Sequence, residues 1–135
     1  MQLLPHLDQR VLLARGEAGL LARALAVLVR DVTHAQRPVP LVEILTFVPL
    51  ATLGRALLKL HQREQLTAAK PGRRPPKPRL LRVPCDQLAA LLHCQGALYY
   101  CHLSVEENLQ LAGIVGKFQQ KSLNLAQWVR FPPAT

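Results

Sequence analysis

Aromatic residues are scarce in this chain of 135 residues, which contains one Trp, two Tyr and three Phe. Strands favour aromatic and β-branched side chains, whereas the Leu and Ala residues that dominate the apolar half of this composition favour helices. The composition therefore predicts a mainly α protein. The same scarcity argues against an RNA-binding sheet that stacks bases on aromatic side chains.

Paired cysteines and long apolar runs are missing as well. The three Cys are an odd number, which fits a reducing compartment better than a disulfide framework. Polar and charged residues interrupt the two most apolar stretches, 40–60 and 88–105, before either supplies the ~20 apolar residues of a membrane span. The first ten residues lack the basic start and apolar run of a secretory signal. We therefore expect a soluble intracellular protein, cytoplasmic or, in a eukaryote, nuclear, with no membrane partner.

The motifs of common enzyme classes are also absent. The sequence has no phosphate-binding P-loop, no GxSxG and no HExxH, and its eight acidic residues are scattered. Cys85, Cys94 and Cys101 lie near His93 and His102. However, adjacent residues point in different directions on a helix or a strand, and no CxxC pair is present. We expect no enzyme activity, no metal and no cofactor, and we interpret the three thiols as packing residues.

Acidic residues are few, and the basic residues are unevenly placed. The chain has 17 Lys or Arg against 8 Asp or Glu, which gives a net charge of +9. The segment 70–82 alone carries six basic residues, four Pro and no acid. Proline favours the extended polyproline II conformation and interrupts helices and central strands. The excess charge therefore belongs mainly to one extended segment and not to a whole surface.

This segment divides the chain into three parts. We predict a helical region at 1–67, a basic Pro-rich linker at 68–79 and a small helical or α+β region at 80–135, with the two outer parts packed as a single domain. The fold class is mainly α, with one or two short strands in the C-terminal half. Periodicity and turn residues predict helices at 7–34 (in two pieces around Gly16 and Gly19), 41–66 (bent or split near Pro49), 85–95, 104–118 and 122–131, and strands at 79–83 and 97–103.

The predicted helix 41–66 carries both apolar and basic faces. Arg55, Lys59 and Arg63 fall on one side, and residues 44–63 contain no acid that would neutralise them through i, i+4 pairs. The apolar residues of helix 41–66 form two sets at helical spacing, Leu41, Ile44, Leu45 and Val48, followed by Leu50, Leu53, Leu57 and Leu60.

The start of the predicted helix 104–118 has a specific local pattern. The sequence SVEE at 104–107 matches a capping box and so predicts a helix start.

The clustered charge favours association with nucleic acid. Lys and Arg contact phosphates irrespective of base sequence and release counterions as they bind. The helices 104–118 and 122–131 also loosely match a helix-turn-helix, in which Gln, Asn and Arg contact base edges. The residues that we predict to contact nucleic acid are Lys70, Arg73, Arg74, Lys77, Arg79 and Arg82 of the basic segment, Arg55, Lys59 and Arg63 of the helix face, and Lys121, Asn124 and Arg130 of the C-terminal pair.

Less specific interpretations stand beside these features. The C-terminal pair fits an antiparallel helical hairpin better than a helix-turn-helix, because Lys117 and Ser122 stand where core residues are expected. The segment 70–82 also suits a soluble spacer, a localisation signal or a PxxP ligand without its flanking basic residue. The alternative function is a helical interaction subunit or adaptor without nucleic-acid contact. So short a chain leaves apolar helix faces for a protein partner or a second copy to cover.

Overall fold

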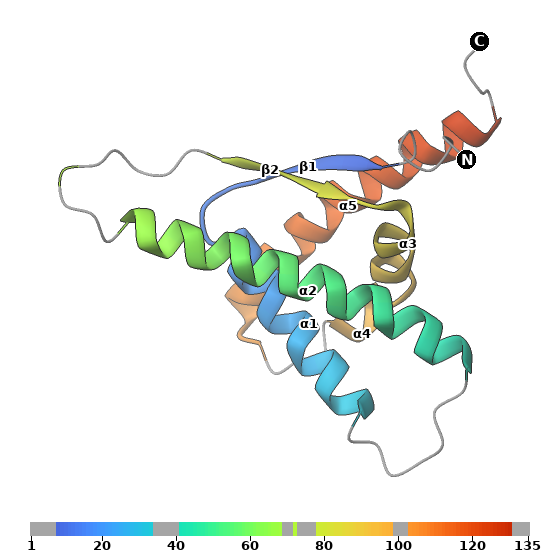
Figure 1. The fold of residues 1–135 in the computed structure, drawn as a ribbon, viewed down its shortest axis with the longest axis horizontal. Coiled ribbons are helices and arrows are strands. Elements are labelled where there is room, and N and C mark those ends of the chain that lie inside the picture. Colours follow the sequence, from blue (N-terminus) through green and yellow to red (C-terminus); the bar gives the residue numbers. More distant parts are fainter. Residues whose placement is uncertain (1–7, 34–40, 69–71, 73–77, 99–102, 131–135) are drawn as a thin grey trace.

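The computed structural model describes residues 8–33, 41–68, 72, 78–98 and 103–130. These residues form, in chain order, β1 (Gln9–Leu13), α1 (Glu17–Thr33), α2 (Leu41–Ala68), β2 (Arg79–Val83), α3 (Cys85–His93), α4 (Gln95–Leu98) and α5 (Val105–Arg130) (Figure 1). The fold is mainly α with one short pair of antiparallel strands, which confirms the predicted class. β2 is the strand predicted at 79–83, whereas β1 comes from the N-terminal region.

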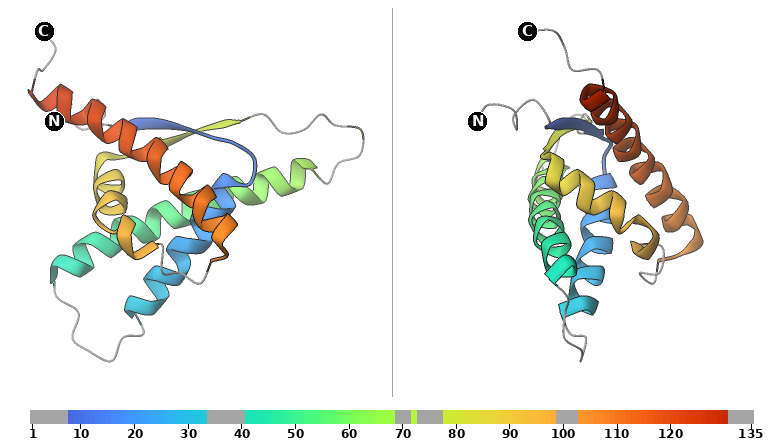
Figure 2. Two further views of the ribbon diagram at one scale, coloured as in Figure 1. Left: turned by 180° about the vertical axis from the view of Figure 1, so that it is seen from behind. Right: turned by 90° about the vertical axis from the view of Figure 1, so that its right-hand side faces the viewer.

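The helices form layers in which α2 and α5 lie on opposite sides of the molecule (Figure 2). α1 and α3 separate them, and each of these two helices packs against both α2 and α5. The β1–β2 ribbon lies at one end of the helices, where β1 contacts α5. The side of α2 that points away from α1 and α3 therefore forms one face of the molecule.

One hydrophobic cluster joins the elements on both sides of the basic segment. Burial of a Leu or Phe side chain contributes about 1.5–3 kcal/mol relative to exposure, so this cluster supplies most of the stabilisation of the fold. Its largest members are fully buried and come from β1, α1, α2, α3, α4 and α5: Leu13, Leu21, Leu25, Leu50, Leu53, Leu57, Leu88, Leu91, Leu98, Leu111, Ile114 and Phe118.

The helix predicted from residue 7 is wrong in its first part, because Gln9–Leu13 forms β1. Val11 and Leu13 are buried while Arg10 and Leu12 are exposed, which is the period of two that a strand requires. β1 pairs antiparallel with β2 in a register that joins Gln9 to Val83. Leu and Arg favour helices locally, so pairing with a strand from far along the chain overrides their preference. Gly19 lies inside α1, so only Gly16 marks a break.

The C-terminal pair of helices is also wrong, because residues 105–130 form the single helix α5. The predicted turn at Gln119–Lys121 consists of residues that favour helices, and nothing in it ends a helix. Neither the helix-turn-helix nor the helical hairpin is therefore present. The predicted start of this helix is confirmed: the N–H of Glu107 donates to Ser104 Oγ at 3.1 Å, and the N–H of Ser104 donates to Glu107 Oε1 at 3.2 Å.

The region between β2 and α5 is more helical than predicted. α3 covers Cys85–His93, close to the predicted helix 85–95. The strand predicted at 97–103 is wrong at its start, because residues 97 and 98 belong to α4. Residues 99–102 of that prediction lie outside the described residues. Leu98 is fully buried, so this short helical turn contributes a side chain to the core.

α2 is a single helix with Pro49 inside it, so of the bend or split predicted near Pro49 the split is not formed. Proline has no N–H and removes one intrahelical hydrogen bond, a loss that packing of the helix must offset. At 100° per residue the two predicted apolar sets point about 150° apart, so one core cannot bury both. The structure buries Leu50, Leu53 and Leu57 of the second set and exposes all four members of the first.

Candidate functional site

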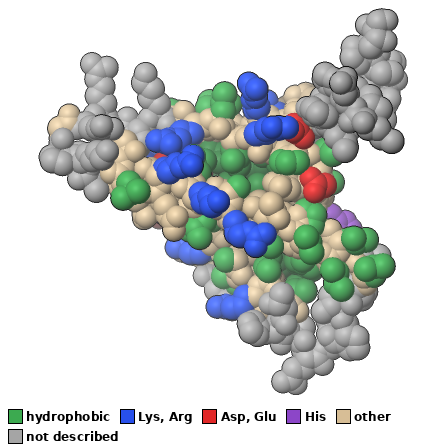
Figure 3. Space-filling view, in the orientation of Figure 1, with side chains coloured by type: hydrophobic (Ala, Val, Ile, Leu, Met, Phe, Trp, Pro, Cys, Tyr) green, Lys and Arg blue, Asp and Glu red, His purple; other side chains and the backbone are tan. Residues whose placement is uncertain are grey.

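The outer side of α2 is exposed to solvent and changes character midway along the helix. Its first half carries the apolar stripe, which we define as Leu41, Ile44, Leu45 and Val48, with exposed fractions of 68%, 44%, 65% and 62%. On the same side, its second half carries the basic stripe, defined as Arg55, Lys59 and Arg63, all exposed. Figure 3 shows this face, with hydrophobic side chains gathered at one end of α2 and Lys and Arg spread over the remainder and the ribbon.

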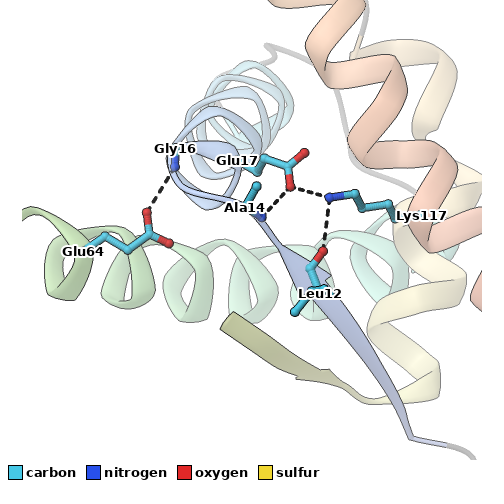
Figure 4. Close-up of polar contacts among 6 residues, drawn as sticks. All are labelled: Leu12, Ala14, Gly16, Glu17, Glu64 and Lys117. Carbon is cyan, nitrogen blue, oxygen red and sulfur yellow. Dashed lines mark hydrogen bonds and ion pairs between the residues drawn. The ribbon is translucent and has the colours of Figure 1, made fainter. Parts of the chain in front are cut away.

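The acid nearest to the basic stripe points into the protein. Glu64 is only 4% exposed, and its Oε2 accepts a hydrogen bond of 3.1 Å from the backbone N–H of Gly16, in the turn before α1 (Figure 4). Gly16 has φ +85°, a backbone conformation that residues with a side chain rarely adopt. Residues 44–63 contain no acid. No exposed carboxylate of α2 therefore neutralises the basic stripe.

The turn that receives Glu64 is also held from α5. Lys117 Nζ donates to Glu17 Oε1 at 2.5 Å and to the carbonyl oxygen of Leu12 at 3.2 Å, and the same Glu17 oxygen accepts from the N–H of Ala14 at 2.6 Å (Figure 4). Lys117 is 40% exposed at its side chain, so solvent screens the ion pair, which contributes at most about 1 kcal/mol. Contacts from both α2 and α5 thus fix the start of α1.

α1 and α2 also approach closely at a second glycine. A Cβ atom on Gly19 would lie 2.6 Å from the imidazole ring of His61, closer than such atoms come in real structures. Gly19 is therefore required by the helix crossing and not by its own backbone angles. Together with the bond between Glu64 and Gly16, this contact sets the rotation of α2 and so determines which side chains point outward.

The remaining predicted contact residues do not join the basic stripe. Arg79 and Arg82 lie on β2, where Arg82 pairs with Asp8, and Arg79 is half-buried. Lys121 is half-buried and Asn124 exposed on α5, on the opposite side of the molecule from α2. Arg130 is the last residue of α5. Four residues of the basic segment lie outside the described residues, namely Lys70, Arg73, Arg74 and Lys77.

The prediction from sequence missed a groove of about 960 Å³ between α1 and α2. Arg23 and Arg30 of α1 and Arg55 of α2 line it, and Arg23 forms an ion pair with Glu107 at the start of α5. Small residues at spacings of three and four leave this space, and that spacing is the signal that was available in the sequence. They are Gly19, Ala22 and Ala26 on α1 and Ala51 and Gly54 on α2.

Cys85 and Cys94 are free and half-buried. Burial raises the pKa of the Cys94 thiol above its ordinary value, and the nearby carboxylate of Glu43 raises it further, because both disfavour the thiolate. Within the described ranges no three His, Cys, Asp or Glu side chains gather into a group that would hold a metal ion. Cys101 and His102 lie outside those ranges. The geometry of Cys94 is thus that of a protonated packing thiol.

No family model, no curated protein and no solved structure matches this chain. The function is therefore proposed from the residues of the chain itself.

Proposed function

We propose that the protein associates with nucleic acid through phosphate contacts made by the basic stripe of α2 and by the basic segment that follows it. The observation that carries this proposal is the electrostatic character of the stripe: three exposed cations on one side of a helix, with the neighbouring acid, Glu64, buried and bonded to Gly16. Successive cations are separated by four residues, or about 6 Å along the helix axis. Such a row suits a polyanion whose charges repeat along a strand.

The chain sequence extends this basic character beyond α2. Lys70, Arg73, Arg74 and Lys77 follow the helix, and no acid lies between Glu64 and Asp86. Contacts of this kind are independent of base sequence, because Lys and Arg here meet phosphates rather than base edges. The loss of the predicted helix-turn-helix removes the residues that were expected to read bases, so the proposal is for binding without sequence preference.

The test is a salt titration of binding to duplex DNA, single-stranded RNA and a non-nucleic polyanion. Removal of one phosphate-binding cation should reduce the slope of log K against log salt concentration by about 0.9 for duplex DNA. We expect this for Arg55→Gln, Lys59→Gln and Arg63→Gln taken singly. Lys121→Gln is the charge-matched control, because α5 lies on the far side of the molecule and this substitution should leave the slope unchanged.

The basic segment is tested separately with Lys70, Arg73, Arg74 and Lys77 all changed to Gln. We expect a slope smaller by about 3.6 if all four contact phosphates of duplex DNA. Duplex binding that is unchanged in this variant and also in the triple variant of the basic stripe would rule out the proposed function.

A second candidate function is that of a helical interaction subunit, and the groove between α1 and α2 favours it. The groove is lined mainly by apolar and small side chains, and Leu58 at its edge is 47% exposed. A Cβ atom on Gly54 would lie 3.8 Å from Leu25, an ordinary contact, and the longer side chain of Gly54→Leu should extend into the groove that Gly54 lines. This function requires that an apolar dye bind the protein and that Gly54→Leu reduce that binding. A monodisperse monomer with no dye binding would exclude it.

A further inference from the structure

The apolar stripe is the feature that nucleic-acid binding leaves unexplained. Its four side chains follow the i, i+3, i+4, i+7 spacing of a buried helix face, yet Leu41, Leu45 and Val48 are each more than 60% exposed. Soluble proteins seldom expose contiguous apolar patches unless the patch meets a ligand, a partner or a lipid. Nucleic acid is not such a ligand, because the backbone it presents to a helix of this kind is anionic.

α2 as a whole is unusually apolar for a helix that is largely exposed. Glu43–Thr67 is long and apolar enough to cross a membrane by length and composition: a stretch of 18 residues within it has a mean hydropathy of 1.3, and only 17% of that stretch is buried. The opposite side of the helix nevertheless packs in the protein core through Leu50, Leu53 and Leu57. A helix that is buried in the protein core on one side cannot be surrounded by lipid, but its other side can lie against a lipid surface.

The outer side of α2 is complementary to a surface of one particular kind. Its first half is apolar and uncharged, and its second half carries Arg55, Lys59 and Arg63 without an exposed acid. A membrane with anionic headgroups offers an acyl layer for the first half and phosphates for the second. Nucleic acid complements only the basic stripe, and a second copy of the chain complements only the apolar stripe. A single lipid surface accounts for both.

We propose that the outer side of α2 docks on an anionic lipid surface, with the apolar stripe inserted between headgroups and the basic stripe lying on the phosphates. The contact is peripheral: α2 lies on the lipid surface with one side and does not span the bilayer. This lipid contact uses the same basic stripe as the proposed nucleic-acid contact, but it does not require that the protein bind nucleic acid. The apolar stripe distinguishes the two, because only lipid requires it.

The test is flotation of the full chain with vesicles of phosphatidylcholine alone and of equal parts phosphatidylcholine and phosphatidylglycerol. We expect binding to the mixed vesicles only. Changing Arg55, Lys59 and Arg63 to Gln should weaken it about 100-fold, since each cation near an anionic surface contributes a factor of about five. Equal binding to both kinds of vesicle would overturn the proposed role of charge.

The apolar stripe is tested with Leu45→Ser/Val48→Ser, which adds no charge. We expect at least about 10-fold weaker vesicle binding, because two inserted side chains are removed, and an unchanged salt slope for DNA. The matched control is Leu109→Ser/Leu123→Ser on α5, where the wild-type side chains are 70% and 59% exposed, and it should bind like the wild type. Circular dichroism checks that each variant is folded.

Two further results would overturn the proposal. One is vesicle binding that the stripe variant leaves unchanged. The other is a wild-type dimer in sedimentation that becomes a monomer in the stripe variant while neither form floats with vesicles, since a second copy would then cover the stripe. A wild-type protein that binds vesicles but not DNA would contradict only the proposed function, so the two proposals fail separately.

Discussion

The orientation of α2 can be tested by making the same substitution on its two sides. Leu53 is fully buried and Leu45 is 65% exposed, and both lie in the interior of one helix. Leu→Ala changes helix propensity equally at the two positions, so the difference between the variants reports burial alone. The structure predicts that Leu53→Ala destabilises the protein strongly and Leu45→Ala only weakly.

The two free energies can be worked out from burial. A Leu→Ala change in a packed core costs about 2–5 kcal/mol, because it removes apolar packing and leaves a cavity. At Leu45 about a third of the side chain is covered, and three CH₂ equivalents at about 0.8 kcal/mol each give a cost of about 0.8 kcal/mol. No enclosed cavity forms at an exposed position. The variants should therefore differ in free energy of unfolding by about 1.2 kcal/mol or more.

Urea unfolding followed by circular dichroism measures this difference. With an m value of about 1–2 kcal/mol/M for a chain of this size, the two midpoints should lie at least about 0.6 M apart. The titration is repeated at several protein concentrations. If the apolar stripe were buried in an oligomer, the free energy of unfolding of the protein would depend on protein concentration. If Leu45→Ala were as costly as Leu53→Ala at every concentration, α2 would be rotated from the orientation described, and the interpretation of its outer side would be refuted.

Three further predictions concern local structure. Gly16→Ala should lower the free energy of unfolding by about 1 kcal/mol, because φ at this position is +85°. Gly113→Ala, at an exposed position within α5, should raise it by about the same amount. Thermal unfolding distinguishes the two signs. Ser104→Ala should cost about 1 kcal/mol through loss of the α5 capping box, and unchanged urea stability would contradict that contact. Because burial and then Glu43 raise the pKa of Cys94, its contribution to stability is complete below the ordinary thiol pKa and falls as pH rises through the raised value. The stability of the wild type relative to Cys94→Ala should therefore decrease as pH rises above the ordinary thiol pKa, and a constant difference would contradict this.

The sequence was sufficient for features that depend on near neighbours in the chain. The capping box at Ser104 is such a local pattern, and it is present. β1 was not accessible in this way, because five residues of alternating burial carry too weak a signal and the pairing partner is distant. The sequence-based prediction divides α5 in two because it places a turn at Gln119–Lys121, although Gln and Lys propagate helices well.

The outer side of α2 lies between these two cases. The spacing of Leu41, Ile44, Leu45 and Val48 identifies an apolar stripe, and the basic stripe is equally visible in the sequence. The two stripes lie on the same side of α2, and this also follows from the rotation of 100° per residue in an α-helix. The sequence does not determine which of the two opposite apolar sets of α2 is buried in the core. That choice depends on where α1 crosses the helix, and so on the contact between Gly19 and His61.

The electrostatics of the basic stripe are a consequence of this same crossing. Glu64 follows Arg63 directly, and in an isolated helix its carboxylate would share the solvent with its basic neighbours and screen them. In the fold, the positive φ of Gly16 turns a backbone N–H toward α2, and Glu64 is buried against it. The packing that orients α2 therefore also withdraws the neighbouring acid that would neutralise the stripe. Replacing Glu64 by Gln, which keeps an acceptor for Gly16, should leave polyanion binding nearly unchanged, because the charge removed lies on the buried side.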